Sequence, residues 1–102
     1  MEEPFDQATA RRFILAILDG PGMTVFTRRV KEALLENEMT SADAMNVLRG
    51  GLIAKGAPGA SGWTYRVQTR RMVVEFSFRG PTRDLAAEPN ELVLERAWRS
   101  AR

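Results

Sequence analysis

The chain has 102 residues and a net charge of +2, with 15 Lys and Arg against 13 Asp and Glu. A chain of this length forms one domain with a single hydrophobic core, so we expect one domain spanning 1–102. The absence of Cys and His excludes disulfides, thiol nucleophiles, cysteine–metal sites and histidine acid–base catalysis. The carboxylates are scattered along the chain, and we expect no metal and no cofactor.

The basic side chains indicate a class of partner. Thirteen of the 15 are Arg, and residues 56–102 hold eight basic and five acidic side chains, against seven and eight in residues 1–55. Guanidinium groups bind phosphate through paired hydrogen bonds and stack on bases, so this balance favours a nucleic acid. The apolar run Phe13–Leu18 is far shorter than the ~20 residues of a membrane helix. Glu2 and Glu3 do not fit a signal peptide, and we expect a cytoplasmic protein without membrane contact.

The first half of the chain predicts three helices. Asp6 can cap a helix whose apolar residues from Ala10 to Leu18 follow a helical period, and Gly20-Pro21 ends it. Residues 23–26 form a short apolar run typical of a strand. Thr27 caps a second helix that ends near 36–38, and Thr40 with Asp43 forms a capping box for a third, which Gly50-Gly51 terminates.

The second half predicts strands. Residues 52–54 favour a short strand, 55–62 (KGAPGASG) a flexible loop, and 80–90 an irregular loop. Within 63–79, apolar residues alternate and change parity between Val67 and Met72, which predicts a hairpin that reverses at 68–71. Residues 91–99 alternate as a last strand, although Glu95-Arg96 also fits a helix. Strands that follow helices indicate an α+β fold, with helices on one face of a mostly antiparallel sheet.

The hairpin carries the candidate site. RNA cleavage by the ribose 2′-OH requires charge stabilisation and proton transfer, and Arg can supply the stabilisation. We assign charge stabilisation to Arg66 with Arg70 or Arg71, and proton transfer to Tyr65 or Glu75. Tyr65 and Trp98 lie on the apolar parity of their strands, so a core role is favoured over base stacking for both. The arginines expected to bind nucleic acid are Arg28, Arg29, Arg71, Arg79 and Arg99.

Five segments together resemble a family of small bacterial proteins with the pattern FTRHA, T-x-x-D-V-x-x-VL-x-x-G, WRYRV, VV-x-F and AWR. Such proteins are similar to RelE/ParE-type toxins, and the resemblance implies a RelE-like core of 23–99 with the helix of 1–22 outside it. It also implies RNA as substrate, an antitoxin chain as partner, and roles for Arg28, Arg29, Arg66 and the pair Trp98-Arg99. The segments are FTRRV (26–30), TSADAMNVLRGG (40–51), WTYRV (63–67), MVVEFSF (72–78) and ELVLERAWR (91–99).

Three functions are open at this point. The first is a toxin-like RNA-binding domain, which would be an endoribonuclease if it cleaves messages. Because Arg29 stands where the family pattern has His, such a domain could also bind RNA without cleaving it. The second function is a non-catalytic module that recruits a protein partner. The third is a ParE-like toxin that targets gyrase. The sequence does not fix the oligomeric state.

Overall fold

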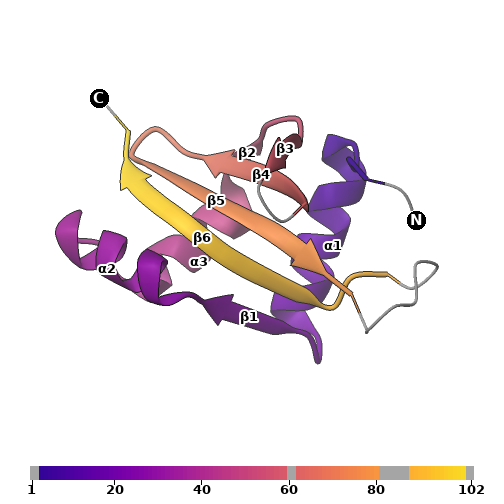
Figure 1. Cartoon of the computed structure of the whole chain (residues 1–102), viewed down its shortest axis with the longest axis horizontal. Helices are drawn as coiled ribbons and strands as arrows, with labels where there is room; N and C mark the ends of the chain where they lie inside the picture. The colour runs from indigo at the N-terminus through magenta and orange to yellow at the C-terminus, as the bar shows by residue number, and fades with distance from the viewer. Residues whose placement is uncertain (1–2, 60–61, 81–87, 101–102) are drawn as a thin grey trace.

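The structure is a computed structural model that describes residues 3–59, 62–80 and 88–100. These residues form three helices and a mixed six-stranded sheet, with the helices packed against it (Figure 1). The α+β fold class predicted from the sequence is confirmed. In chain order the elements are α1 (Gln7–Asp19), β1 (Met23–Phe26), α2 (Arg28–Glu36), α3 (Ser41–Gly50), β2 (Leu52–Ile53), β3 (Ala57–Gly59), β4 (Gly62–Gln68), β5 (Met72–Arg79) and β6 (Glu91–Arg99).

The helices begin where the capping residues predict. The carboxylate of Asp6 accepts a 2.7 Å hydrogen bond from the Thr9 N–H, and the Thr27 hydroxyl accepts one from the third helical amide of α2. At α3 the capping box is complete, because Thr40 and Asp43 each accept a bond from the other's backbone N–H. Each bond satisfies an amide that has no partner inside its own helix, which fixes the helix starts.

The strand order across the sheet is β1-β6-β5-β4-β2, and β3 pairs with β4 beside this path. β1 runs parallel to β6, with Met23 opposite Glu91 and Phe26 opposite Leu94. The other pairs are antiparallel, as expected, and β4 and β5 form the predicted hairpin with its reversal after Gln68. The first and last strands of the chain therefore lie side by side.

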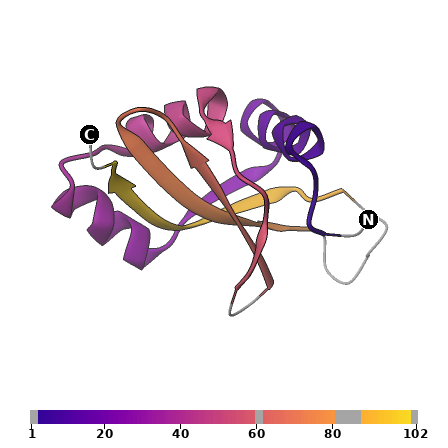
Figure 2. The same ribbon diagram turned by 90° about the horizontal axis from the view of Figure 1, so that it is seen from above.

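One predicted loop contains a strand. Within 55–62, residues Ala57–Gly59 form β3, which pairs with Gly62–Thr64 at the start of β4. Pro58 fits there because an edge strand tolerates a residue without an N–H. In the view of Figure 2, this β3–β4 hairpin extends from the side of the sheet opposite α1 and α3. The loop predicted for 80–90 lies mostly outside the described residues.

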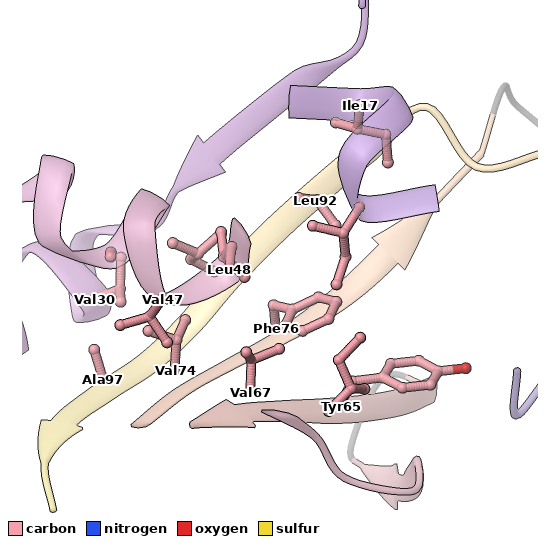
Figure 3. Packing of buried hydrophobic residues seen from close by; sticks show 14 of the residues in the cluster. Ile17, Val30, Val47, Leu48, Tyr65, Val67, Val74, Phe76, Leu92 and Ala97 are labelled. Atoms are coloured by element: carbon pink, nitrogen blue, oxygen red, sulfur yellow. The ribbon is translucent and has the colours of Figure 1, made fainter. Parts of the chain in front are cut away.

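The hydrophobic core lies between the helices and one face of the sheet. α1 supplies Ala10, Phe13, Ile14 and Ile17, so it packs into the same core as the rest of the chain. From the sheet come alternate residues of β4, β5 and β6, among them Val67, Val74, Phe76 and Leu92 (Figure 3). None of the helices in the described ranges is long and apolar enough to cross a membrane.

An irregularity in β6 changes which side chains reach the core. Glu75 of β5 pairs with Arg96, but the next residue, Phe76, pairs with Leu94, so Glu95 is an extra residue in the ladder. Such a bulge shifts the alternation of the strand that carries it. Leu92 and Leu94 face the core as predicted, whereas Trp98 lies on the opposite face, beside Val73, and the prediction of a core role for Trp98 is wrong. The strand prediction for 91–99 is confirmed.

The core predicts a stability difference between two leucines. Leu48 is fully buried, whereas Leu52 is 77% exposed. Leu48→Ala removes packed methyl groups and leaves a cavity, so we expect a loss of about 2–5 kcal/mol in the free energy of unfolding. Leu52→Ala should change it by less than about 0.5 kcal/mol. Urea unfolding of both variants measures the difference, and equal losses would contradict the described core.

Candidate nucleic-acid interface

The face of the sheet turned away from the helices carries a row of charged side chains. Arg66 of β4 lies opposite Glu75 of β5, and Glu75 lies opposite Arg96 of β6. These residues alternate along their strands with core residues such as Val67 and Val74, so they point to the other side. We call this side the open face. The row spans the three central strands of the sheet.

The two arginines cover the carboxylate between them. Arg66 donates from Nη2 and Nε to Glu75 Oε2 at 2.6 and 3.2 Å, and Arg96 Nη1 lies 3.7 Å from Oε1. The Glu75 side chain is 11% exposed, against 49% for Arg66 and 62% for Arg96. A guanidinium has five N–H donors, so both arginines keep donors that point to solvent. The row has a net charge of +1 and presents its cations outward.

Trp98 lies next to this row on the open face. The Arg66 Cζ is 5.1 Å from the centre of the Trp98 ring and the Arg96 Cζ is 5.8 Å away. Cations this close to an indole are attracted by its electron-rich face. The half-buried ring therefore orients both arginines and leaves part of its own surface available to a ligand.

A groove of about 450 Å³ runs beside the row, between the β3 segment and the open face. Its lining includes Arg66, Arg96 and Glu75 from the sheet, and Lys55 and Pro58 from the segment before β4. The groove therefore has cations on both sides and the Glu75 carboxylate among its lining groups. A volume of this size accommodates a small polar ligand or part of a chain.

Tyr65 is separated from Arg66 by the sheet. Its ring is in the core (Figure 3). Its hydroxyl accepts a 2.9 Å hydrogen bond from the Phe5 N–H and donates a 2.8 Å bond to the Glu3 carboxylate. Burial raises the pKa of Tyr65 well above its ordinary value, and the hydrogen bond to Glu3 adds to the increase. The predicted core role is confirmed, and the hydroxyl does not share a face with Arg66.

Arg70 and Arg71 lie in the turn between β4 and β5. The Arg71 carbonyl accepts a 2.9 Å hydrogen bond from the Ser100 N–H, and the Arg70 carbonyl accepts one from the Ser100 hydroxyl. Arg70 follows Arg66 by four residues, which corresponds to roughly 13 Å along a strand. The structure therefore does not bring Arg70 or Arg71 together with Arg66 and Glu75.

Arg99 is bound to the end of α2. Its Nε donates to the Asn37 carbonyl at 2.6 Å, and its Nη2 donates to the Glu38 carbonyl at 3.1 Å. Carbonyls at a helix C-terminus lack partners inside the helix and carry partial negative charge, so a guanidinium is favourable there. Arg99 thus joins β6 to α2, which accounts for it without a nucleic acid.

The remaining predicted arginines lie at other places. Arg28 and Arg29 are exposed in the first turn of α2, where Arg28 Nε is 3.7 Å from Glu32 Oε2. This turn follows β1, which is three strands from β4, or roughly 14 Å across the sheet. Arg79 is exposed at the end of β5, opposite Glu91; it shares the open face with Glu75 but follows it by four residues, or roughly 13 Å along the strand.

The sequence predictions assigned no role in the site to two of its cations, Arg96 and Lys55, and they placed Trp98 on the wrong face. A signal for Arg96 exists in the sequence, because Glu95-Arg96 interrupts the apolar alternation of β6 where the bulge occurs. Lys55 has no comparable signal, since its position depends on the unpredicted strand β3.

The buried tyrosine predicts a dependence of stability on pH. An exposed tyrosine ionises near pH 10, so above about this pH the unfolded chain loses a proton that the native chain keeps. The contribution of Tyr65 to the free energy of unfolding should therefore be complete below about pH 10. The free energy of unfolding should fall as the pH rises further.

Tyr65→Phe removes this ionisation and should flatten the loss in alkaline buffer, at a cost of about 1 kcal/mol at neutral pH for the missing hydrogen bonds. Urea unfolding at several alkaline pH values measures the difference. Ultraviolet absorbance of the single Tyr follows its ionisation directly. Equal alkaline slopes for the two proteins would contradict the placement of Tyr65.

Comparison of the chain with protein-family models, with curated proteins and with solved structures found no match. The functional argument therefore depends on the geometry of the open face.

Proposed function

We propose that this chain is a toxin-like RNA-binding domain that binds RNA on the open face of its sheet. The observation that carries the proposal is the groove in which Arg66, Arg96 and Lys55 come together beside Trp98. The resemblance of five segments to proteins similar to RelE/ParE-type toxins supports RNA as the ligand. The resemblance implies two helices packed on an antiparallel sheet, and the order of α2 and α3 followed by β2 to β6 fits that arrangement.

The three cations would bind the phosphates. Arg66 and Arg96 are held by Glu75, so their remaining N–H groups are oriented before a ligand arrives. Orientation in advance lowers the entropy lost on binding. Lys55 comes from the other side of the groove, so a phosphodiester chain that follows the groove meets cations on both sides. Phosphate contacts of this kind are independent of sequence.

Trp98 would bind a base. Its ring lies within 6 Å of both guanidinium carbons, at 5.1 and 5.8 Å, so a base stacked on the ring places its phosphate near the arginines. Stacking on an aromatic ring contributes about 1–3 kcal/mol per base in proteins that bind single strands. Unpaired RNA exposes its bases for such contacts, whereas bases in a duplex are already stacked. The geometry thus favours single-stranded RNA.

We propose binding, and not cleavage, as the activity of the open face. Arg66 and Arg96 could stabilise a phosphorane, but cleavage also needs proton transfer. Of the two groups expected to move protons, Tyr65 lies on the other face of the sheet, and Glu75 has its oxygens next to two guanidiniums. We further propose that an antitoxin-like protein partner with acidic side chains would cover the same face, because carboxylates and phosphates bind the same cations.

The binding proposal predicts a response to mutation and salt. The double variant Arg66→Ala/Arg96→Ala should bind a single-stranded RNA oligonucleotide at least tenfold more weakly, because each charged hydrogen bond contributes about 1.5–3 kcal/mol. Three neutralised phosphates on single-stranded RNA give a slope of about −2 for the logarithm of the association constant against that of salt concentration. Fluorescence anisotropy measures both quantities.

Arg49→Ala is the control. The Arg49 guanidinium pairs with Asp19 between α3 and α1, so this variant removes one positive charge, half of what the double variant removes, from the helical side of the molecule. We expect its affinity for RNA to remain within about twofold of the parent, since the removed charge contacts no ligand and screening limits its reach to about 10 Å. Circular dichroism checks that all variants fold. An RNA affinity that does not change with salt concentration would contradict the proposal, and so would an equal loss of affinity in the control.

Binding without cleavage predicts intact messages. The parent chain is expressed in bacteria from an inducible promoter beside Arg66→Ala/Arg96→Ala, with ultraviolet crosslinking of bound RNA and mapping of message 5′ ends. We expect RNA crosslinked to the parent and not to the double variant, with the same message ends in both. New ends that appear with the parent only would show that the open face also cleaves RNA. Absence of crosslinked RNA from both would overturn the binding proposal itself.

A further inference from the structure

α2 carries its charges in the order that its own dipole disfavours. Its first turn contains the basic residues Arg28, Arg29 and Lys31, whereas Glu36 ends the helix and Glu38 follows the cap. The N-terminus of a helix has partial positive charge and its C-terminus partial negative charge, so both groups oppose the dipole, and Arg99 compensates part of the negative charge at the C-terminal end. Each of these charges is unfavourable, most of all at low ionic strength. Charges placed against the helix dipole at both ends indicate that they interact with something other than α2 itself.

Beside this helix lies an apolar hollow of about 670 Å³. Phe26, Leu34 and Met39 contribute to its lining, and Leu35 stands at it with 80% of its surface exposed. Lys31 lines the same hollow. The surface thus combines a protruding leucine with a concave apolar site, and the basic end of the helix borders it. α2 lies at one end of the molecule in both views, away from the β3–β4 hairpin (Figures 1 and 2).

These features fit a second copy of the same chain. In a two-fold symmetric dimer each subunit uses the same patch, so a protruding group must find a matching hollow on an identical surface. An antiparallel pair of α2 helices would place the basic first turn of one helix against Glu36 and Glu38 of the other. It would also oppose the two helix dipoles, which relieves at both ends the conflict present in the single chain. We propose that the surface formed by α2 and the adjacent hollow is a self-association interface, with Leu35 of each subunit bound in the hollow of the other.

This inference is independent of the proposed RNA binding, because α2 and the groove beside Arg66 are separate parts of the molecule. Charge complementarity favours a second copy of this chain, and not another protein, as the partner at the α2 surface. A surface with basic and acidic ends matches its own image after a two-fold rotation, whereas another partner would need to reproduce this pattern independently. The dimer should weaken as salt increases, since exposed charges are screened over about 10 Å at 0.1 M.

Sedimentation equilibrium tests the interface through charge exchange. One variant is Arg29→Glu/Lys31→Glu and the other is Glu36→Lys/Glu38→Lys. Each alone should repel its own copy and sediment near the 11.4 kDa of a monomer at concentrations where the parent sediments near twice that mass. An equimolar mixture of the two restores opposite charges at both ends and should recover the dimer. Each variant also gives α2 charges that suit its dipole, so its melting temperature should not fall.

Leu35→Ser tests the apolar part, with Leu52→Ser as the matched control. Both leucines are exposed, at 80% and 77%, but only Leu35 adjoins the hollow. We expect Leu35→Ser to raise the dimer dissociation constant at least tenfold and Leu52→Ser to leave it unchanged. A parent that remains monomeric at its highest soluble concentration would overturn the proposal. A dimer dissociation constant that Leu35→Ser leaves unchanged would also overturn it, as would a mixture of the charge variants that stays monomeric.

Discussion

The open face depends on one extra residue in β6. Glu95 has no partner opposite it in the ladder, so residues before it and residues after it follow opposite alternations. Without this bulge, a strand that buries Leu92 and Leu94 would also turn Arg96 and Trp98 toward the helices. The core would then have to accommodate a guanidinium and an indole between β6 and the helices. With the bulge, Ala97 takes the core position, and the two larger side chains join Arg66 on the other side. Bulges are common next to functional sites for this reason.

Glu75 gives the open face its order. Its side chain lies under two arginines, and an acidic residue in such a position is stable only when cations compensate it. The same contact restrains two long side chains that would otherwise sample many rotamers. Trp98 adds a second restraint through its ring. The Glu75 carboxylate therefore does not prevent Arg66 and Arg96 from binding a ligand. It fixes their positions, and both arginines keep N–H donors that point outward.

The sequence predicted the elements better than the site, and the reason is physical. Helix starts are local, because Asp6, Thr27 and Thr40 each bind an amide within three residues, and the structure confirms all three. Alternation of apolar residues predicted the β4–β5 hairpin for the same reason. The site depends on register between strands and on one bulge, and such information is not local. Arg99 illustrates the limit, since nothing near it in the sequence reveals that Asn37 and Glu38 of a distant helix bind its guanidinium.

The parallel pair of β1 and β6 has a consequence for how the chain acquires its structure. β6 lies between β1 and β5, yet among the described elements it is made last, whereas its partner β1 is made second. The sheet cannot close until synthesis has passed residue 99, so the central pairs of the sheet form only after all the elements from α1 to β5 have been made. Contacts between such distant segments slow folding, because a long loop must be ordered before they form. Until then β1 and β5 both expose strand edges, and the nascent chain is most prone to aggregate during this interval.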